Sequence, residues 1–360
     1  MQRTHIFMVH ASFVFFKVIF ILSFLFISGG PAFAQSPKPF LASDSFNEEF
    51  RGSQMMRVGF YNVENLFDYF NDSLTLDDEF LPNTGRYWTK AKYLNKVQKI
   101  AQTIVAIGGW EAPALMGLCE VESRYVLNSL VNFSLLKSAG YEFVHKDSPD
   151  TRGIDVALLY RPEKFELIDF DFIEVNFPFD PESTTRYILY AQGELPNKDK
   201  LHVFVNHWPS KFGGEFETAP KRVFVSKVLQ TKVDSLLQKN VESNILIMGD
   251  LNDNPSSTSV MSLTQQRSMV NLMNDIEYKF GTHSFEGEWS VIDHLLVSKN
   301  MLTRNNGLKV KNNTAIIFDM DYLLVEGSNG NKRPFRTYQG PAYLGGFSDH
   351  LPIYLDLILK

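Results

Sequence analysis

Apolar residues recur with a helical period in two stretches of the chain. In residues 89–107 they fall on one face, while Lys92, Lys96 and Lys99 fall off it. Residues 221–239 repeat the pattern with valine and leucine. Such stripes are typical of helices that lay one face on a flat surface. We therefore predict two amphipathic helices that pack on a sheet.

Eight short runs rich in β-branched and aliphatic residues predict strands. Several runs are apolar almost throughout, as expected where both faces of a strand are covered. Together with the helices they predict a layered α/β (or α+β) domain with sheets inside. No interior stretch has the composition of a linker, so residues 56–360 are interpreted as one domain. The predicted strands are residues 57–61, 114–119, 154–160, 187–194, 201–206, 245–248, 291–297 and 351–357.

The N-terminal pattern is of another kind. A short, strongly apolar run, residues 18–27, follows Arg3 and Lys17 and is followed by Ala32-Phe33-Ala34. This layout predicts a signal peptide over residues 1–34 and export to the periplasm or the medium. The alternative is an uncleaved N-terminal anchor. Residues 35–55 are polar and are interpreted as a linker, and no membrane-spanning segment is expected after cleavage.

Composition narrows the possible functions. The chain has 360 residues, 44% of them hydrophobic, with one cysteine and a formal charge of −6. The hydrophobic fraction suits a packed core rather than disorder. A single cysteine excludes an internal disulfide framework and a cysteine-based zinc site. The negative balance excludes nucleic-acid binding that depends on bulk positive charge.

Polar residues gather where the predicted strands end. Carboxylates and amides at strand ends form an oxygen-ligand set suited to Mg²⁺, and histidines near aspartates suit proton transfer to and from a phosphoester. We find no Walker loop, dinucleotide fingerprint or serine elbow. Six such endings predict a shared rim, formed by Asn62 and Glu64, Glu120 and Glu122, His207, Asp250 and Asn252, Asp293 and His294, and Asp349 and His350.

The order of these motifs resembles the endonuclease/exonuclease/phosphatase superfamily over residues 57–358. The resemblance implies a four-layer α/β sandwich, with two packed mixed sheets and helices outside, and Mg²⁺-dependent hydrolysis of phosphoesters, with Mn²⁺ as a possible substitute. The motifs are Phe60-Tyr61-Asn62-Val63-Glu64-Asn65, Gly117-Leu118-Cys119-Glu120-Val121, Val205-Asn206-His207-Trp208-Pro209-Ser210, Gly249-Asp250-Leu251-Asn252-Asp253, Ile292-Asp293-His294 and Ser348-Asp349-His350.

The resemblance also implies residue roles. Glu120 would be the principal metal ligand, with Asn62, Glu64 and Asp349 around the metal or the scissile phosphate. The remaining roles concern the water, the phosphate and the protons. Asp250 and Asn252 would orient the water and hold the phosphate. His350 would act as base or acid, supported by Asp293. His207 would be the second proton-handling residue, with Asp155 as its orienter and Arg152 near the phosphate.

Five nearby residues are expected to have ordinary roles. Glu122 is interpreted as a solvated neighbour of the site, and Lys211 and Arg222 as solvated bases. His294 and Trp208 are interpreted as packing residues.

The sequence leaves the substrate open. The favoured reading is an exported Mg²⁺-dependent endonuclease or phosphodiesterase, a monomer that acts on nucleic acid and has no stable protein partner. The alternative is a phosphatase or phospholipase-C-type phosphodiesterase for lipid headgroups, inositol phosphates or other small organophosphates. Aromatic residues in 170–173 and 177–179 would serve a lipid surface, but they fit strands and turns equally well. A catalytically silent binding module is disfavoured, because such a module would be free to lose His350 or Asp250.

Overall fold

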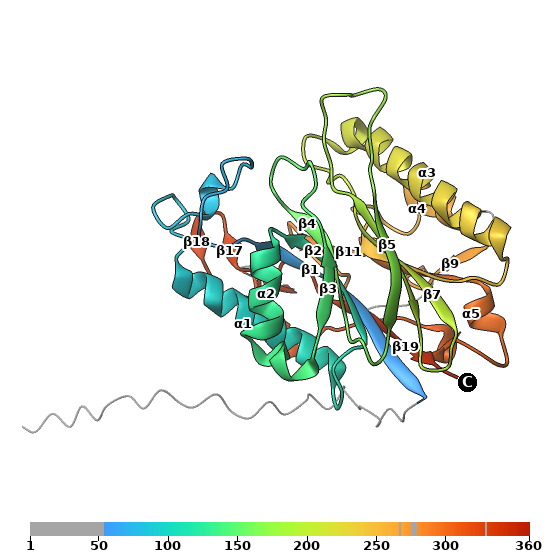
Figure 1. Cartoon of the computed structure of the whole chain (residues 1–360). Coiled ribbons are helices and arrows are strands. Elements are labelled where there is room, and N and C mark those ends of the chain that lie inside the picture. The colour runs from blue at the N-terminus through green and yellow to red at the C-terminus, as the bar shows by residue number, and fades with distance from the viewer. Residues whose placement is uncertain (1–53, 266–267, 275–278, 328–329) are drawn as a thin grey trace, which may run out of the picture. The chain divides into compact units, whose positions relative to one another are not determined.

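A computed structural model describes residues 54–360 except 266–267, 275–278 and 328–329 (Figure 1). The predicted signal peptide and nearly all of the predicted linker lie outside the described residues. Within the described part, no helix is both long and apolar enough to cross a membrane.

The first sheet carries the N-terminal half of the rim. β1 (Met55–Leu66) lies parallel to β2 (Leu115–Val121) and antiparallel to β19 (Ile353–Ile358). In the described residues the strand order is β13-β19-β1-β2-β4-β3, with β14 also on β19. The remaining members are β3 (Glu142–His145), β4 (Asp155–Tyr160), β13 (Lys309–Val310) and β14 (Ile316–Ile317).

The second sheet carries the other half. β7 (Lys200–His207) and β8 (Asn244–Asp250) are parallel neighbours, and β12 (Asp293–Ser298) runs antiparallel to β8. The strand order in the described residues is β5-β6-β7-β8-β12-β9. Its other strands are β5 (Glu166–Ile173), β6 (Ile188–Glu194) and β9 (Met269–Asn271).

The two sheets face each other across one hydrophobic cluster, which includes Phe60 and Leu118 from the first sheet and Met248 and Leu295 from the second. Gly117 lies at this interface, where a Cβ atom would collide with Met248. The absence of a side chain at Gly117 therefore lets the sheets approach.

Helices cover the outer faces (Figure 1), which confirms the predicted four-layer sandwich of two mixed sheets. α1 (Lys90–Gly108) and α2 (Arg124–Asn132) belong to the cluster of the first sheet, and α3 (Glu215–Lys239) and α4 (Thr258–Thr264) pack on the second. Thr89 caps α1 by accepting a hydrogen bond from the Lys92 backbone N–H.

Several predicted boundaries need correction. The first strand extends to Leu66, five residues beyond its predicted end, and the last begins at Ile353, two residues later than predicted. α3 begins at Glu215, six residues before its predicted start, and accommodates Pro220 near its N-terminus. The last-but-one predicted strand begins at Asp293, two residues later than predicted, because Ile292 and Asp293 donate backbone hydrogen bonds to the Thr282 side chain. β3, β5 and β9 were not predicted.

Short elements complete the described part of the fold. They include three hairpins: β10 (His283–Phe285) with β11 (Glu288–Ser290), β15 (Leu324–Glu326) with β16 (Lys332–Pro334), and β17 (Tyr338–Gln339) with β18 (Ala342–Tyr343). The rest are α5 (Asn300–Thr303) and four 3₁₀ turns, Asp78–Phe80, Leu135–Ala139, Lys311–Asn313 and Asp321–Leu323.

We expect Gly249→Ala to destabilise the protein by roughly 1–3 kcal/mol. A Cβ at this position would lie 2.5 Å from the Asn206 backbone oxygen, so the parallel pair β7 and β8 must separate. Urea unfolding measures the loss. Gly85→Ala is the control, because a Cβ there meets nothing within 4 Å. Equal stability of the two variants would contradict the prediction.

Candidate active site

The strand ends that the sequence predicts to converge do meet at one edge of the sandwich. Asp250, at the end of β8, pairs in register with His207 of β7 and with Asp293 of β12. Asn62, in β1 of the other sheet, donates a hydrogen bond from Nδ2 to Asp250 Oδ2 at 3.0 Å. This contact joins the two sheets at the site.

Asp250 lies at the centre of the cluster. Its Oδ2 atom is 3.8 Å from His207 Nε2 and 3.7 Å from His350 Nε2, and its Oδ1 accepts from the Asn252 backbone N–H at 2.9 Å. Burial raises the pKa of Asp250 to about 7, against the lowering effect of His350. One carboxylate thus faces both histidines.

The two histidines have opposite electrostatic surroundings. His350 Nδ1 is 2.7 Å from Asp293 Oδ2. Burial acts to lower the pKa of His350, but Asp293 and Asp250 outweigh it and raise this pKa to about 10. For His207, burial and the nearby charges of Arg186 and Arg152 hold the pKa well below its ordinary value. At neutral pH His350 is therefore an imidazolium and His207 a neutral imidazole.

Glu120 is placed to hold a divalent cation. It follows the buried residues of β2, and its Oε2 accepts from the Asn65 backbone N–H at 2.8 Å. Within the described residues no Lys or Arg forms an ion pair with Glu120 or with Asp250. Carboxylate oxygens without a protein counter-ion fit Mg²⁺ or Mn²⁺.

Asn62 serves the site as a donor. Its Oδ1 accepts from the Glu64 backbone N–H at 3.0 Å, which leaves Nδ2 directed at Asp250 and, at 3.5 Å, at Glu120. In this arrangement Asn62 Nδ2 orients the carboxylates, and the predicted role of Asn62 as a metal ligand stays a prediction.

Glu64 and Asp349 are also engaged by other residues. Glu64 Oε2 accepts from the Thr337 backbone N–H at 2.6 Å and lies 3.4 Å from Lys96 Nζ. Arg336 pairs with Asp349 at 2.8 Å and approaches Glu64 at 3.4 Å. The predicted metal-ligand set is therefore divided: in the described residues Glu120 forms no ion pair with Lys or Arg, while Glu64 and Asp349 both do.

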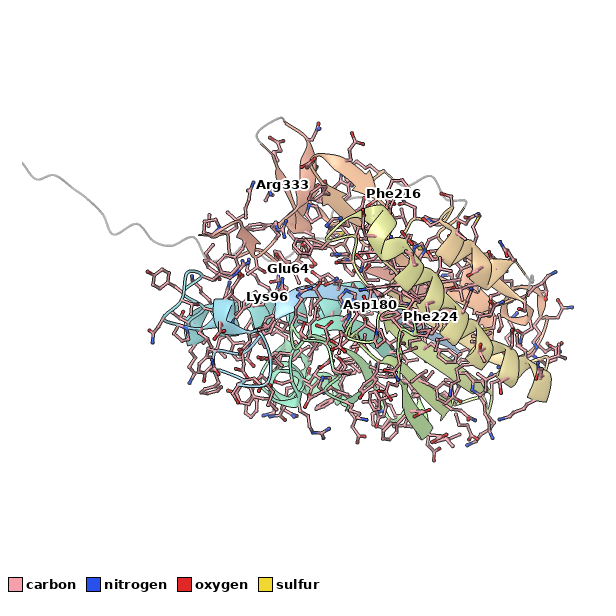
Figure 2. All side chains as sticks on the ribbon, turned by 90° about the horizontal axis from the view of Figure 1, so that it is seen from above. Glu64, Lys96, Asp180, Phe216, Phe224 and Arg333 are labelled. Carbon is pink, nitrogen blue, oxygen red and sulfur yellow. The ribbon has the colours of Figure 1, made fainter. Side chains whose placement is uncertain are left out.

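Lys96 is buried, contrary to the prediction that it lies off the apolar face of its helix. Its side chain is 1% exposed and lies beside Glu64, as Figure 2 shows. Its position three residues after Tyr93 and four before Ile100 puts it at the edge of the apolar stripe. This spacing is the feature of the sequence that indicates a buried position for Lys96. No comparable pattern marks Arg336 as a site residue.

Three of the predicted site residues have left-handed backbones. Glu64, Glu120 and Asn252 have φ values of 50°, 62° and 53°. Such backbones cost energy and cluster at functional sites, where the surrounding structure holds them. Glu64 and Glu120 lie where the strand register shifts, between Asn62 and Leu66 in β1 and between Cys119 and Val121 in β2, and Asn252 follows the end of β8.

The expected pairing of Asp155 with His207 is not formed. Asp155 Oδ1 accepts from the Ser148 backbone N–H at 3.0 Å, and its Oδ2 lies 3.7 Å from His145 Nε2. His207 Nδ1 is buried without a hydrogen-bond partner in the described residues. A role for Asp155 in catalysis stays a prediction.

Two arginines flank the His207 segment. Arg152, predicted near the phosphate, donates to Asn65 Oδ1 at 2.7 Å. Arg186, missed by the sequence reading, is buried and donates to the backbone oxygens of His207 and Trp208. Its charge is matched by Asp150 at 2.9 Å. Arg186 thus fixes the backbone that carries His207.

A family model, the Endonuclease/Exonuclease/phosphatase family, matches residues 57–359. The chain belongs to this family. No curated protein sequence matches it. Members of the family hydrolyse phosphoester bonds and typically depend on a divalent metal, which agrees with a carboxylate-rich site flanked by histidines.

Solved structures of the same fold cover most of the chain. A family protein from Bacteroides thetaiotaomicron is 16% identical with a TM-score of 0.55, and covers 85% of this chain and 98% of its own. The mannosyl-6-phosphatase of that organism is 17% identical (TM-score 0.55; 84% and 100% covered). The human Nocturnin catalytic domain is 16% identical with a TM-score of 0.54, and the match covers 85% of this chain and 94% of that domain. At these identities the likeness shows the shared family fold.

The residues given ordinary roles divide into two groups. Trp208 and His294 are fully buried and packed, as predicted: Trp208 Nε1 donates to Asn206 Oδ1, and His294 contacts Asn271 and the Asp253 backbone oxygen.

Arg222 and Glu122 are buried rather than solvated. Arg222 pairs with Asp253 at 2.7 Å, a contact between α3 and the segment after β8. Lys211 is partly exposed and pairs with Glu215.

His283, unassigned from the sequence, lies at the site. Its ring centroid is 4.7 Å from that of His350. Burial lowers its pKa to about 4. A neutral His283 therefore packs against the imidazole of His350.

We expect Glu122→Gln to remove part of the pH dependence of folding. Burial raises the pKa of Glu122 to about 8, from 4.5. The folded state then binds a proton that the unfolded state releases, so stability falls as pH rises from about 5 to 8, by at most about 1.4 kcal/mol per pH unit. Gln keeps an acceptor for the Asp68 N–H bond. Urea unfolding at pH 5 and pH 8 measures the difference between variant and wild type.

The exposed Glu182→Gln is the matched control and should follow the wild type at both pH values. If Glu122→Gln also follows the wild type, the buried carboxyl does not shift as described.

Proposed function

We propose that this family member is an exported, divalent-metal-dependent phosphodiesterase that cleaves nucleic acid. The observation that carries the proposal is the placement of Asp250 Oδ2 within 4 Å of two imidazoles with opposite pKa shifts. Hydrolysis of a phosphoester needs a proton acceptor for the water and a donor for the phosphoryl oxygens. His207 and His350 meet these needs.

The roles of the other residues follow from their contacts. Neutral His207 accepts a proton from the attacking water, which Asp250 and Asn252 orient. Protonated His350, held by Asp293, donates to a phosphoryl oxygen as charge accumulates there. A divalent ion bound at Glu120 would supply further stabilisation of that charge.

Exposed bases near the site support a polyanionic substrate despite the net negative charge. Arg152 is exposed beside Asn65, and Arg336 is one-third exposed beside Asp349. Local positive charge at a site can attract phosphates where the overall charge does not. Export is proposed from the N-terminal pattern of residues 1–34.

A second candidate is hydrolysis of small organophosphates. A cavity of about 380 Å³ adjoins the site, lined by Asn65, Arg152, Arg86, Phe67 and Phe80 among others. A cavity of this size accepts one small group beside the scissile phosphate rather than a duplex. The structural support for a lipid substrate is divided: Phe177 is buried in the core, whereas Phe170 and Phe179 are each more than half exposed.

We expect the purified protein to nick supercoiled plasmid with Mg²⁺ and not with chelator, and His350→Ala to lose at least about 100-fold in rate. Nicked circles on a gel measure this. Absence of nicking, with retained Mg²⁺-dependent hydrolysis of an aryl phosphodiester, would favour the second candidate. Hydrolysis unchanged in both His350→Ala and Asp250→Ala would refute the mechanism.

We expect Asp293→Asn to lower kcat by roughly 100-fold at pH 8, with partial recovery towards pH 5. Loss of the carboxylate returns the pKa of His350 towards its ordinary value, so the imidazole is neutral at pH 8 and charged again at lower pH. A pH profile with bis(p-nitrophenyl) phosphate measures the change. Asp169→Asn, on the exposed strand β5, should leave the profile unchanged; a uniform loss at all pH values in Asp293→Asn would contradict the assigned role.

A further inference from the structure

Two cations of the protein itself lie inside the carboxylate cluster. Lys96, from α1, is 1% exposed, and its Nζ contacts Glu64 at 3.4 Å, the Thr337 hydroxyl at 2.6 Å and the Phe347 backbone oxygen at 2.5 Å. A buried ammonium is tolerated only with paired and hydrogen-bonded partners. Lys96 is therefore a fixed positive charge behind Glu64.

The second cation bridges two carboxylates. Arg336 Nη2 lies 2.8 Å from Asp349 Oδ2, and Arg336 Nε lies 3.4 Å from Glu64 Oε1. Its side chain is 36% exposed, so it reaches the carboxylates from the solvent side. Arg336 thus stands between the two predicted metal ligands that do not belong to the Asp250 group.

The charges balance pairwise. Glu64 faces Lys96, Asp349 faces Arg336, and Asp293 faces His350. Glu120 and Asp250 remain, and in the described residues neither has an ion pair with Lys or Arg. His350 Nε2 also lies 3.7 Å from Asp250 Oδ2, so the charges are counted over the whole cluster: five carboxylates exceed the three cations Lys96, Arg336 and His350 by two, which is the charge of one divalent ion. A second ion would have to enter beside Glu64 and Asp349 against two fixed positive charges.

We propose that Arg336 occupies the position that a second divalent ion would need, so that the centre binds a single ion. The inference rests on the proposed metal dependence and concerns the number of ions. Arg336 is then a positioning residue, whose positive charge substitutes for a metal.

A purely structural role for Arg336 predicts a different result. If the guanidinium only ties the segment after β16 to the sandwich, its removal lowers stability but leaves the number of bound ions unchanged. Counting the bound ions therefore separates the two roles. The most informative variants are those that remove or keep the positive charge at position 336.

The experiment is a Mn²⁺ titration followed by electron paramagnetic resonance, which reports free ions and the magnetic coupling of ions bound close together. We expect one bound ion per chain in the wild type and in Arg336→Lys. In Arg336→Gln and Arg336→Met, we expect two ions with a coupled spectrum, because Asp349 loses its ion pair and Glu64 then faces one cation, Lys96, instead of two. Arg333→Gln is the control, since Arg333 lies on the same segment but contacts Gln339; it should bind one ion.

Two coupled ions in the wild type would overturn the inference without any variant. A single ion in folded Arg336→Gln and Arg336→Met, judged by circular dichroism, would overturn the role of Arg336, and two ions in Arg336→Lys would overturn the role of its charge. The count is independent of hydrolysis. A wild type with one ion and no phosphoesterase activity refutes the proposed function alone, and an active wild type with two ions refutes this inference alone.

Discussion

Crowding of five carboxylates at one edge of the sandwich, with Glu64, Asp250 and Asp293 fully buried, is the constraint on which the site depends. Each buried negative charge requires a cation or hydrogen-bond donors, since an unpaired one would cost several kcal/mol. Asp293 is met by His350, Glu64 by Lys96 and the Thr337 backbone, and Asp349 by Arg336. These partners come from α1, from the segment after β16 and from the approach to β19. The need to neutralise the edge therefore ties together parts of the chain that are far apart in sequence.

Close approach of the two sheets is the second requirement. Asn62 of one sheet reaches Asp250 of the other only because small residues lie where the sheets and strands touch. Gly117 faces Met248 across the core, and Gly249 precedes Asp250 against the backbone of Asn206. The geometry of the site thus follows from packing several residues away from the chemistry.

Much of the fold and of the candidate site is predictable from the sequence, because the informative patterns are local. A polar residue that follows an apolar run marks the end of a buried strand, and this rule placed Asn62, His207, Asp250 and Asp293 at one edge. Lys96, Arg186 and Arg336 escaped because their roles depend on partners brought near by tertiary packing; the Thr337 that contacts Lys96 is 241 residues away. Arg222 and Glu122 were read as solvated for the same reason. The substrate is not encoded by such rules, and the family fold, shared with proteins of 16–17% identity, hosts more than one activity.

The left-handed backbones of Glu64, Glu120 and Asn252 have an evolutionary consequence. Glycine at each of these positions would relieve local strain, yet it would delete a side chain from the site. Selection for heat resistance alone would therefore favour glycine at positions 120 and 252, but not at position 64, where the loss of Glu64 would leave the buried Lys96 without its ion pair. The protein thus gives up some stability to keep these side chains in the site. Stabilising substitutions should leave these three residues unchanged and be sought elsewhere in the sandwich.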